Sequence, residues 1–342
     1  MKLIILIPTL NSNKTLWATL VHLDLAAMEL ELKIIVIDGG SIDRNLKTLA
    51  QIWPPIKVIK HEGKGLASTR NRAIYEAIKE QKTFNADYWL FLDSDVMIPS
   101  DFFRRLIFGL KRQDNIATAE LNADFTPNWE GWQNPADKML VPRYYHAVKG
   151  MTPDGNKIGI GNATICTLMN PEAVEKVFMD ERFVHGGEDI DFHLQLAEMG
   201  YKGFVDYNRP WAWHIRTPSL LDEVKKLFWR GNARALNLKL HKKYAGHGVL
   251  YTLLACAVTS GSLLFIINPF ILHSPLSLKT ELIPLSLLYL RQLLKLKKPW
   301  QLHWGLVGLF FSFFYLSGAS FGFLRYWIAP NLNMDAIKRG LI

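Results

Sequence analysis

The sequence is poor in cysteine, which excludes one class of protein at the outset. Only two of its 342 residues are cysteine, Cys166 and Cys256, and two cysteines cannot build the disulfide framework of a small secreted domain. Cys256 also lies inside a long apolar segment. We therefore expect both side chains to be free thiols.

The N-terminal segment also lacks the long apolar core of a secretory signal. The apolar run Leu3–Ile7 stops at Pro8, whereas a signal peptide needs about 7–15 apolar residues in succession. We interpret this run as a first β-strand.

Two segments near the C-terminus lack charged side chains altogether. Residues 248–273 and 302–324 contain no Asp, Glu, Lys or Arg, and each exceeds the roughly 20 residues that a helix needs to cross a bilayer. We predict that residues 241–342 form a membrane region with transmembrane helices at both segments and a third candidate at residues 276–290. The alternative is a helical hairpin buried in a protein core.

Positive charge is in excess, with a formal net charge of +9 at pH 7, which indicates an anionic partner. Basic residues flank the apolar segments at His241–Lys243 and Arg291–Lys298, where anionic lipid headgroups would be met. This favours membrane lipids over nucleic acid as the partner. By the positive-inside rule the same clusters predict a multi-pass protein of the cell membrane, with the N-terminal domain on the cytoplasmic side.

Residues 1 to about 130 alternate short β-rich runs with helical stretches. Leu16, Leu20 and Leu23 recur at helical spacing after the first run, and residues 67–80 place small and apolar side chains on one helical face. Such alternation is typical of βαβ units and predicts an α/β fold with a mainly parallel sheet. The predicted strands are Leu3–Ile7, Lys33–Ile37, Ile56–Ile59 and Tyr88–Leu92.

Polar residues follow three of these strands. Thr9 and Asn11 follow the first strand, Asp38 and Gly40 the second, and Asp93 the fourth. Ligands of open parallel sheets bind beyond the carboxyl ends of the strands, so we expect these residues to line one crevice. The alternative is that they serve only as turn residues.

The segment WLFLDSDV places Asp93 and Asp95 two positions apart at the end of an apolar strand. Residues two apart in an extended chain face the same side, so both carboxylates can bind one Mg²⁺ or Mn²⁺. Phosphate oxygens and water commonly complete such a shell. His214, which follows two tryptophans, is a candidate third ligand through a neutral imidazole nitrogen.

A second acidic cluster, in HGGEDIDFHLQLAEMG, contains Glu188 and Asp189 at the start of a predicted helix. Acidic residues in a first turn also stabilise a helix through its dipole, so a purely structural role is the alternative. Because a metal site is already expected, we favour a role as general base.

Basic residues Lys64 and Arg70 lie in HEGKGLASTRNRAI, where a strand leads into a helix. This position suits an anionic nucleotide. The glycine and lysine spacing of a Walker A loop is absent. The alternative is a solvated basic face of the helix.

Taken together, the ordered motifs IPTLN, VIDGGSIDRN, GLASTRNRAI, FLDSDV and GGEDIDF, with the later His214, resemble the family 2 inverting glycosyltransferases, which have the GT-A fold. The resemblance spans about residues 3–235. It implies that residues 1–240 form a GT-A glycosyltransferase domain, followed by the predicted transmembrane helices.

The resemblance also implies roles for single residues. Asp38 would hold the nucleotide base, Asp189 would be the catalytic base beside Glu188, and His214 would complete the metal site of Asp93 and Asp95. Thr69 stands where the family motif has alanine. The residues implied on the donor side are Pro8, Thr9, Asn11, Asp38, Gly40, Lys64, Arg70 and Asp93.

The implied reaction moves one sugar from a UDP- or GDP-linked donor to an acceptor hydroxyl with inversion, assisted by Mg²⁺ or Mn²⁺. The Q-x-x-R-W motif of processive synthases is absent, which predicts addition of a single sugar. The membrane segments imply a lipid-linked or membrane-proximal acceptor. The oligomeric state is left open.

Three alternatives to this reaction differ from it in what they require of the sequence. A polyprenyl-phosphate glycosyltransferase would need no base, because its acceptor phosphate is already ionised near neutral pH. An inactive membrane-bound module for a sugar or nucleotide would need no base either. A nucleotidyltransferase would need a glycine-rich loop after the first strand, and IPTLNSNKT contains no glycine.

Overall fold

The computed structural model describes residues 1–42, 46, 48–49, 55–63, 65–121, 123–125, 156–160, 164–208, 210, 212–215, 220–244 and 302–328. Lys64 and the predicted spans 248–273 and 276–290 lie outside these residues. The chain divides into two compact units. The first comprises Met1–Gly131 and Arg143–Thr217, and the second Trp132–Pro142 and Pro218–Ile342.

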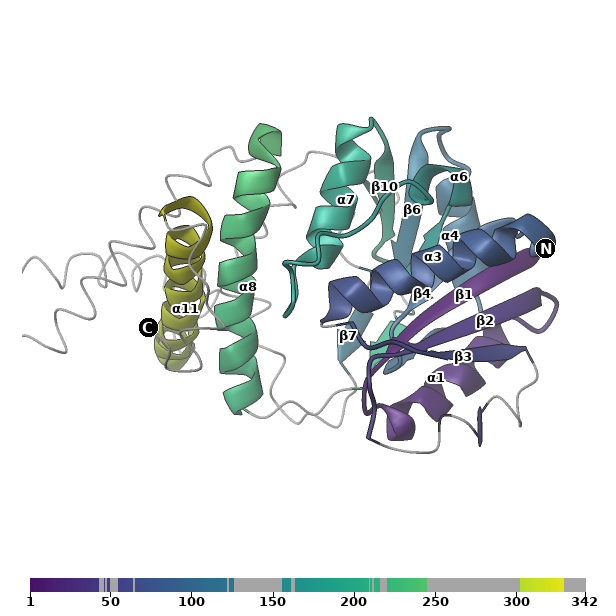
Figure 1. The fold of residues 1–342 in the computed structure, drawn as a ribbon, viewed down its shortest axis with the longest axis horizontal. Coiled ribbons are helices and arrows are strands. Elements are labelled where there is room, and N and C mark those ends of the chain that lie inside the picture. Colours follow the sequence, from purple (N-terminus) through teal and green to yellow (C-terminus); the bar gives the residue numbers. More distant parts are fainter. Residues whose placement is uncertain are drawn as a thin grey trace, which may run out of the picture. The chain divides into compact units, whose positions relative to one another are not determined.

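The first unit alternates strands and helices, as the sequence predicts, and all four predicted strands are confirmed (Figure 1). Its elements are β1 Lys2–Thr9, α1 Asn13–Ala26, β2 Glu31–Asp38, β3 Ile56–Lys60, α3 Leu66–Phe84, β4 Tyr88–Leu92, β5 Val96–Met97, α4 Phe102–Leu110, β6 Ile116–Leu121, β7 Ala123–Phe125, β8 Lys157–Gly159, β9 Cys166–Met169, α6 Pro171–Val174, α7 Glu188–Glu198, β10 Lys202–Asp206 and β11 Ala212–His214.

The strands form a large and a small sheet. The large sheet has eight strands in the order β3-β2-β1-β4-β9-β6-β10-β8. Its first four strands are parallel to one another, β9 runs antiparallel to both β4 and β6, and β10 is parallel to β6. The small sheet has the order β5-β11-β7. The predicted α/β fold with a mainly parallel sheet is therefore confirmed.

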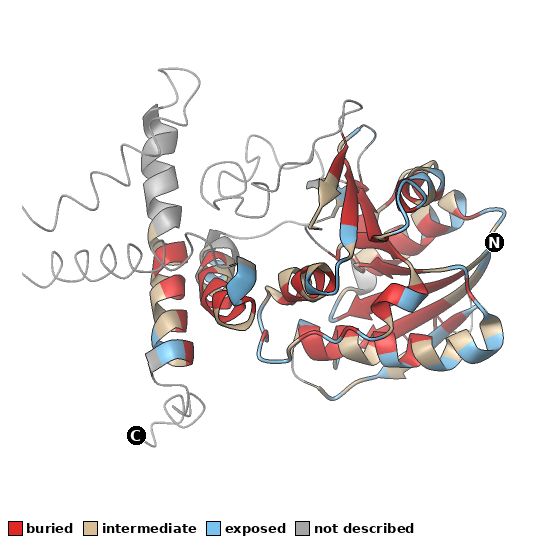
Figure 2. Ribbon diagram, turned by 90° about the horizontal axis from the view of Figure 1, so that it is seen from above, coloured by how far each residue is buried: buried red, intermediate tan, exposed pale blue. Residues whose placement is uncertain are grey.

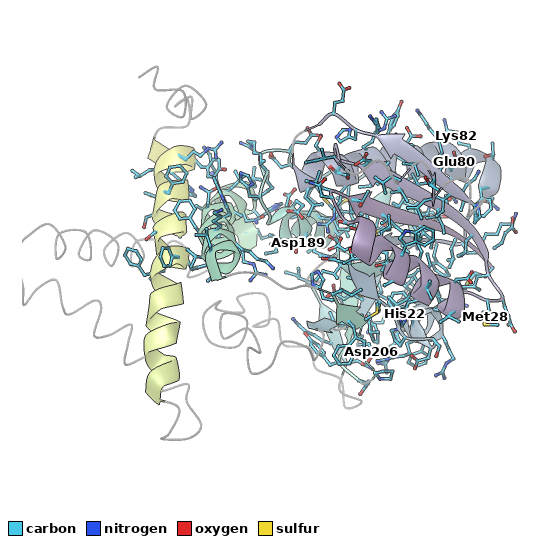
Figure 3. All side chains as sticks on the ribbon, turned by 90° about the horizontal axis from the view of Figure 1, so that it is seen from below. His22, Met28, Glu80, Lys82, Asp189 and Asp206 are labelled. Carbon is cyan, nitrogen blue, oxygen red and sulfur yellow. The ribbon has the colours of Figure 1, made fainter. Side chains whose placement is uncertain are left out.

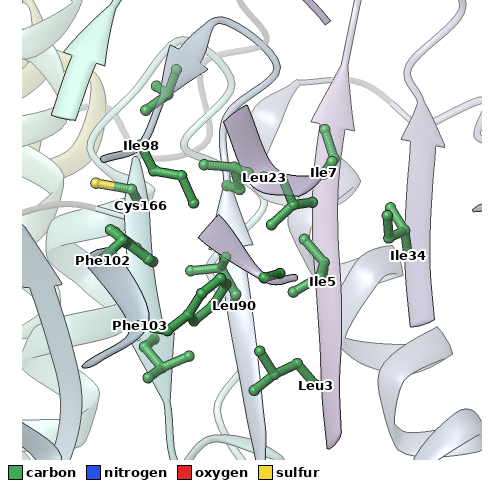
Figure 4. Close-up of a cluster of buried hydrophobic side chains, with 14 of the residues drawn as sticks. Leu3, Ile5, Ile7, Leu23, Ile34, Leu90, Ile98, Phe102, Phe103 and Cys166 are labelled. Carbon is green, nitrogen blue, oxygen red and sulfur yellow. The ribbon is translucent and has the colours of Figure 1, made fainter. Parts of the chain in front are cut away.

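The core lies on both faces of β1, whose residues Leu3–Ile7 have no exposed surface. Leu3, Ile5 and Ile7 pack in one cluster with Leu23 of α1 and with residues of α4 (Figure 4). Helix α3 packs on β1 and β2. A strand covered on both faces has to be apolar throughout, which explains the unbroken apolar run Leu3–Ile7. Figure 2 shows the resulting buried sheet between partly exposed helices.

The described part of the second unit is a pair of helices. Helix α8 spans Leu220–Leu240 and is followed by a short 3₁₀ turn at Lys242–Tyr244; helix α11 spans Leu302–Phe323 and continues as a π-helical turn to Ile328. The two helices pack along each other. Glycines allow their backbones to touch, since a Cβ at Gly318 would lie 1.8 Å from the Phe228 carbonyl oxygen and one at Gly231 1.9 Å from that of Tyr315.

The prediction of transmembrane helices is wrong. In the portion of the chain that the structure describes, no helix is long and apolar enough to cross a membrane. Residues 302–323 do form a helix, and its buried residues pack against α8. Packing on a protein helix removes apolar side chains from water just as lipid would. The predicted multi-pass location in the cell membrane is wrong with it, while the domain boundary at residue 240 stays a prediction.

Replacing Gly318 by alanine tests the close contact of α8 and α11. The added methyl group has no space beside the Phe228 backbone, so we expect Gly318→Ala to lower the free energy of unfolding by about 1–3 kcal/mol. Urea denaturation measures the change. Leu324→Ala, at a side chain that is more than half exposed, is the control and should shift stability by less than about 0.5 kcal/mol. Equal, small effects of both would contradict the contact.

Candidate active site

The three polar strand ends meet at one edge of the sheet. β1 lies between β2 and β4 and is parallel to both. Thr9 and Asp38 are opposite each other in the β1–β2 register, Pro8 is opposite Ile37, and Asp93 directly follows β4. The structure thus brings the donor-side candidates at the ends of β1, β2 and β4 to one edge.

The loops after β1 and β2 are fastened to each other. The buried Asp38 accepts hydrogen bonds at Oδ1 from the backbone N–H of Gly40 (3.2 Å) and of Ser41 (2.8 Å). Asn11 donates its N–H to the Ser41 hydroxyl (2.9 Å), and its Oδ1 accepts from the Ile42 N–H (2.9 Å). Asn11 and Gly40 both have positive φ, 53° and 99°, which asparagine and glycine tolerate best. These hydrogen bonds hold the loop after β1 and the loop after β2 in a fixed arrangement, which we call the frame.

Two side chains at this edge were missed by the sequence reasoning. His61 Nε2 lies 3.0 Å from the hydroxyl of Ser68, which is buried in the first turn of α3. Gly63 leaves room for this contact, because a Cβ there would lie 2.1 Å from His61 Nε2. A histidine in a loop and a serine in a helix give no local signal that they touch.

Arg70, from α3, joins two carboxylates that are distant in sequence. Its side chain is 3% exposed; Nη2 donates to Asp93 Oδ1 (2.8 Å) and Nη1 donates to Glu188 Oε1. The guanidinium also lies over the Phe91 ring, 5.9 Å from its centroid. The Arg70 guanidinium is therefore paired with protein carboxylates and is almost entirely buried.

The cluster of Arg70, Asp93 and Glu188 holds two carboxyl groups and one guanidinium in a largely buried position. Burial raises the pKa of Glu188 to about 7, although the Arg70 guanidinium opposes the shift. Burial likewise raises the pKa of Asp93, again against the effect of Arg70. Burial alone would lower the pKa of Arg70, but Asp93, Glu188 and Asp189 together raise it. The positive charge of the guanidinium thus offsets the repulsion between these carboxylates.

Helix α7 begins at Glu188, the first residue of the second acidic cluster. Gly186 and Gly187 have φ of 124° and 97°, a turn that glycine makes without strain, and Glu188 then opens the helix. Glu188 is buried, whereas Asp189 is half-buried and its Oδ1 accepts from the Ile190 N–H at 2.8 Å (Figure 3). Of the two acidic candidates, Asp189 is the one with exposed surface.

Asp95 directly precedes β5 and lies next to His214 of the neighbouring strand β11. His214 is opposite Val96 in the antiparallel β5–β11 pair, and the Ile215 N–H donates to the Asp95 carbonyl (2.6 Å). This register brings His214 Nε2 to 2.9 Å from Asp95 Oδ2. The two residues are 119 positions apart in the sequence, so only the folded chain unites them.

The Asp95–His214 pair lies at the distance of an ordinary hydrogen-bonded pair, and the same distance would suit two ligands of one divalent cation. Adjacent ligands of an octahedral Mg²⁺, at bonds of about 2.1 Å, lie about 3.0 Å apart, close to the separation seen here. Across the described residues, no group of three or more His, Cys, Asp or Glu side chains is arranged to hold a metal. The predicted set is divided: Asp95 pairs with His214, and Asp93 pairs with Arg70.

A comparison with known sequences now identifies the family. The sequence profile described as Glycosyl transferase family 2 matches residues 4–178. This range is half of the chain and contains most of β1, all of β2 and β4, and the residues Asp93 and Asp95. The chain belongs to glycosyl transferase family 2. The predicted family and the predicted enzyme class, a glycosyltransferase, are confirmed.

Two curated relatives and one solved structure are similar to this glycosyltransferase. It is 29% identical to the uncharacterized glycosyltransferase YfnE of Bacillus subtilis over 64% of its own length and 52% of the relative. It is 30% identical to a dolichol-phosphate mannosyltransferase of Pyrococcus furiosus over 41% of its own length and 40% of the relative. The alignments thus span about half or less of each relative.

The solved structure is the mannosyltransferase PcManGT from Pyrobaculum calidifontis, in complex with GDP-Man and Mn²⁺. The similarity covers 96% of this glycosyltransferase and 87% of that chain, with a TM-score of 0.56 and 14% sequence identity. At this identity the similarity shows the shared GT-A fold.

The raised pKa of Glu188 predicts how stability depends on pH. Between about pH 4.5, its ordinary value, and pH 7 the unfolded chain releases this proton while the folded chain keeps it, so the free energy of unfolding should fall as the pH rises. Glu188→Gln should remove this part of the slope. Urea denaturation at several pH values measures it.

Glu198→Gln, at the exposed end of the same helix, is the matched control and should keep the wild-type slope between pH 4.5 and 7. A wild-type stability that rises over this range, or a slope unchanged in Glu188→Gln, would contradict the assignment.

Proposed function

We propose that this glycosyltransferase transfers one sugar from a UDP- or GDP-linked donor to an acceptor hydroxyl, with inversion and with the aid of Mg²⁺ or Mn²⁺. The observation that carries the proposal is the arrangement at the ends of β1, β2 and β4. The hydrogen-bonded loops after β1 and β2 lie at this edge, and Asp95, shortly after β4, pairs with His214 of β11. The half-buried Asp189 lies in the first turn of α7, next to Glu188, which Arg70 joins to Asp93.

The donor nucleotide binds at the frame built by the β1 and β2 loops. Asp38 Oδ1 is occupied by backbone N–H groups, which leaves Oδ2 to accept an N–H from the nucleobase. Thr9 Oγ1 is buried with no hydrogen-bond partner in the described structure, so a ligand hydroxyl or N–H can satisfy it. Pro8, Asn11 and Gly40 shape this frame. A donor-side role of Lys64 stays a prediction from the sequence, because this residue lies outside the described ones.

Asp95 and His214 would hold the cation, with Asp93 close by. Phosphate oxygens of the donor and water would supply its other ligands, as is usual for Mg²⁺. When bound, a divalent cation stabilises the negative charge that develops on the departing nucleoside diphosphate. The side chains contribute by fixing where the diphosphate lies.

Asp189 is the general base. Its half-buried carboxylate can accept the acceptor's hydroxyl proton as the oxygen attacks the anomeric carbon and the bond to the diphosphate breaks. One in-line displacement of this kind inverts the configuration. Glu188 is buried against Arg70 and therefore supports the site without meeting the acceptor.

A phosphate acceptor is the second candidate, favoured by the 30% identity to a dolichol-phosphate mannosyltransferase. A polyprenyl phosphate is already ionised near neutral pH, so its attack needs no base. The two candidates therefore differ in what they require of Asp189.

Release of nucleoside diphosphate from a panel of UDP- and GDP-sugars tests the proposal. Purified protein is assayed with Mg²⁺ or Mn²⁺ and with acceptor mixtures of free glycans, glycolipids and polyprenyl phosphate. We expect metal-dependent release with one donor. Asp95→Asn should lower kcat/KM by about 10²–10³-fold, because the cation stabilises the leaving group by several kcal/mol.

Asp189→Asn separates the two acceptor classes. For a hydroxyl acceptor kcat should fall about 10²–10⁴-fold, the range of general-base catalysis, while the Kd of the nucleoside diphosphate stays near that of wild type. Asp114→Asn, at an exposed turn residue, is the control and should keep full activity. Full activity of Asp189→Asn with polyprenyl phosphate would replace the first candidate by the second.

A further inference from the structure

We propose that Arg70 is a positioning residue that fixes the base-bearing helix α7 against the metal side of the site. The proposal rests on the proposed function for the roles of Asp95 and Asp189. It assigns to Arg70 a task other than donor binding, the role that the sequence resemblance implies for it.

The contacts of Arg70 join three separate elements. The arginine lies in α3, Asp93 directly follows β4, and Glu188 opens α7. These partners are 23 and 118 positions away in the sequence. A single guanidinium therefore sets the separation between the end of β4 and the start of α7.

Each partner is next to a residue with a proposed chemical role. Asp95 is two positions after Asp93, and Asp189 is one position after Glu188. Movement of either partner would carry its neighbour along the same backbone. Arg70 thus controls where the base lies relative to the cation, although it touches neither group.

The apolar surroundings hold the guanidinium in place. Its carbon lies 5.9 Å from the centroid of the Phe91 ring, and Phe91 in turn meets Phe192 of α7 edge to face, with centroids 6.1 Å apart. β4 and α7 are therefore joined twice, by a ring pair and by the arginine. A planar guanidinium suits both the ring face and the two carboxylates, which a lysine ammonium cannot match.

Direct contact of Arg70 with a donor phosphate has little support in this geometry. Both terminal nitrogens already donate to carboxylates, and the side chain is only 3% exposed. The remaining N–H groups of the guanidinium, among them the Nε–H, are buried with the side chain, so a phosphate would reach them only after a rearrangement of the site.

Arg70→Lys tests the proposal, with Arg72→Lys as the matched control on the same helix. Arg72 is 38% exposed in its side chain and pairs with Glu76 at 2.8 Å. We measure kcat and donor KM, the Kd of the nucleoside diphosphate with Mn²⁺, and the melting temperature. A displacement of about 1 Å in a catalytic group can lower the rate about 100-fold.

We therefore expect Arg70→Lys to lower kcat about 100-fold while the Kd of the nucleoside diphosphate changes less than about threefold. Arg72→Lys should leave both near wild type. A rise in this Kd with kcat unchanged would show that Arg70 binds the donor and would overturn the proposal. So would an Arg70→Lys protein with wild-type kcat.

A thermal cycle of Arg70→Lys, Glu188→Gln and the double variant tests the contact without any assay of transfer. If the two side chains act together, the double variant should melt close to the less stable single variant. Additive losses would overturn the contact. Should wild type release no nucleotide from any donor, the proposed function fails, and this cycle together with the Kd still decides the role of Arg70.

Discussion

Parallel hydrogen bonding of β1 to both β2 and β4 is the constraint on which the rest of the first unit depends. It brings the carboxyl ends of three strands to one edge, and it requires β1 to be covered on both faces. α1 and α4 supply one cover and α3 another. The same helix α3 that covers the sheet also carries Arg70 to the edge. Core packing and site geometry are therefore set by one arrangement of elements.

The edge of the sheet gathers negative charge in a place with little water, and this costs stability unless a cation is supplied. Arg70 supplies one inside the protein, for Asp93 and Glu188. The Asp95–His214 pair lies near this cluster, since Asp95 is two residues after Asp93, and we propose that it holds a divalent ion. In our proposal the site thus has a fixed internal cation and an exchangeable outer one. That division explains why two aspartates of one short motif have different surroundings.

The helices of the second unit show that the apolar side chains of a segment can be removed from water in more than one way. Residues 302–324 carry no charge, and a bilayer and a neighbouring helix both remove such residues from water. Gly231 and Gly318 allow α8 and α11 to pack closely, because backbone atoms of the partner helix occupy the place of their missing side chains. The hydropathy of the sequence alone does not predict this close contact between α8 and α11.

The sequence by itself determined the elements and the family. Strands such as Leu3–Ile7 and Tyr88–Leu92 follow from local apolar patterning, and the motifs around Asp38, Asp93 and Asp189 identify the glycosyltransferase because their order along the chain is informative. Only the tertiary structure decided which side chains touch. The pairing of Arg70 with Glu188 and of Asp95 with His214 depends on strand register and helix packing. Those are long-range properties, and local residue patterns carry no record of them.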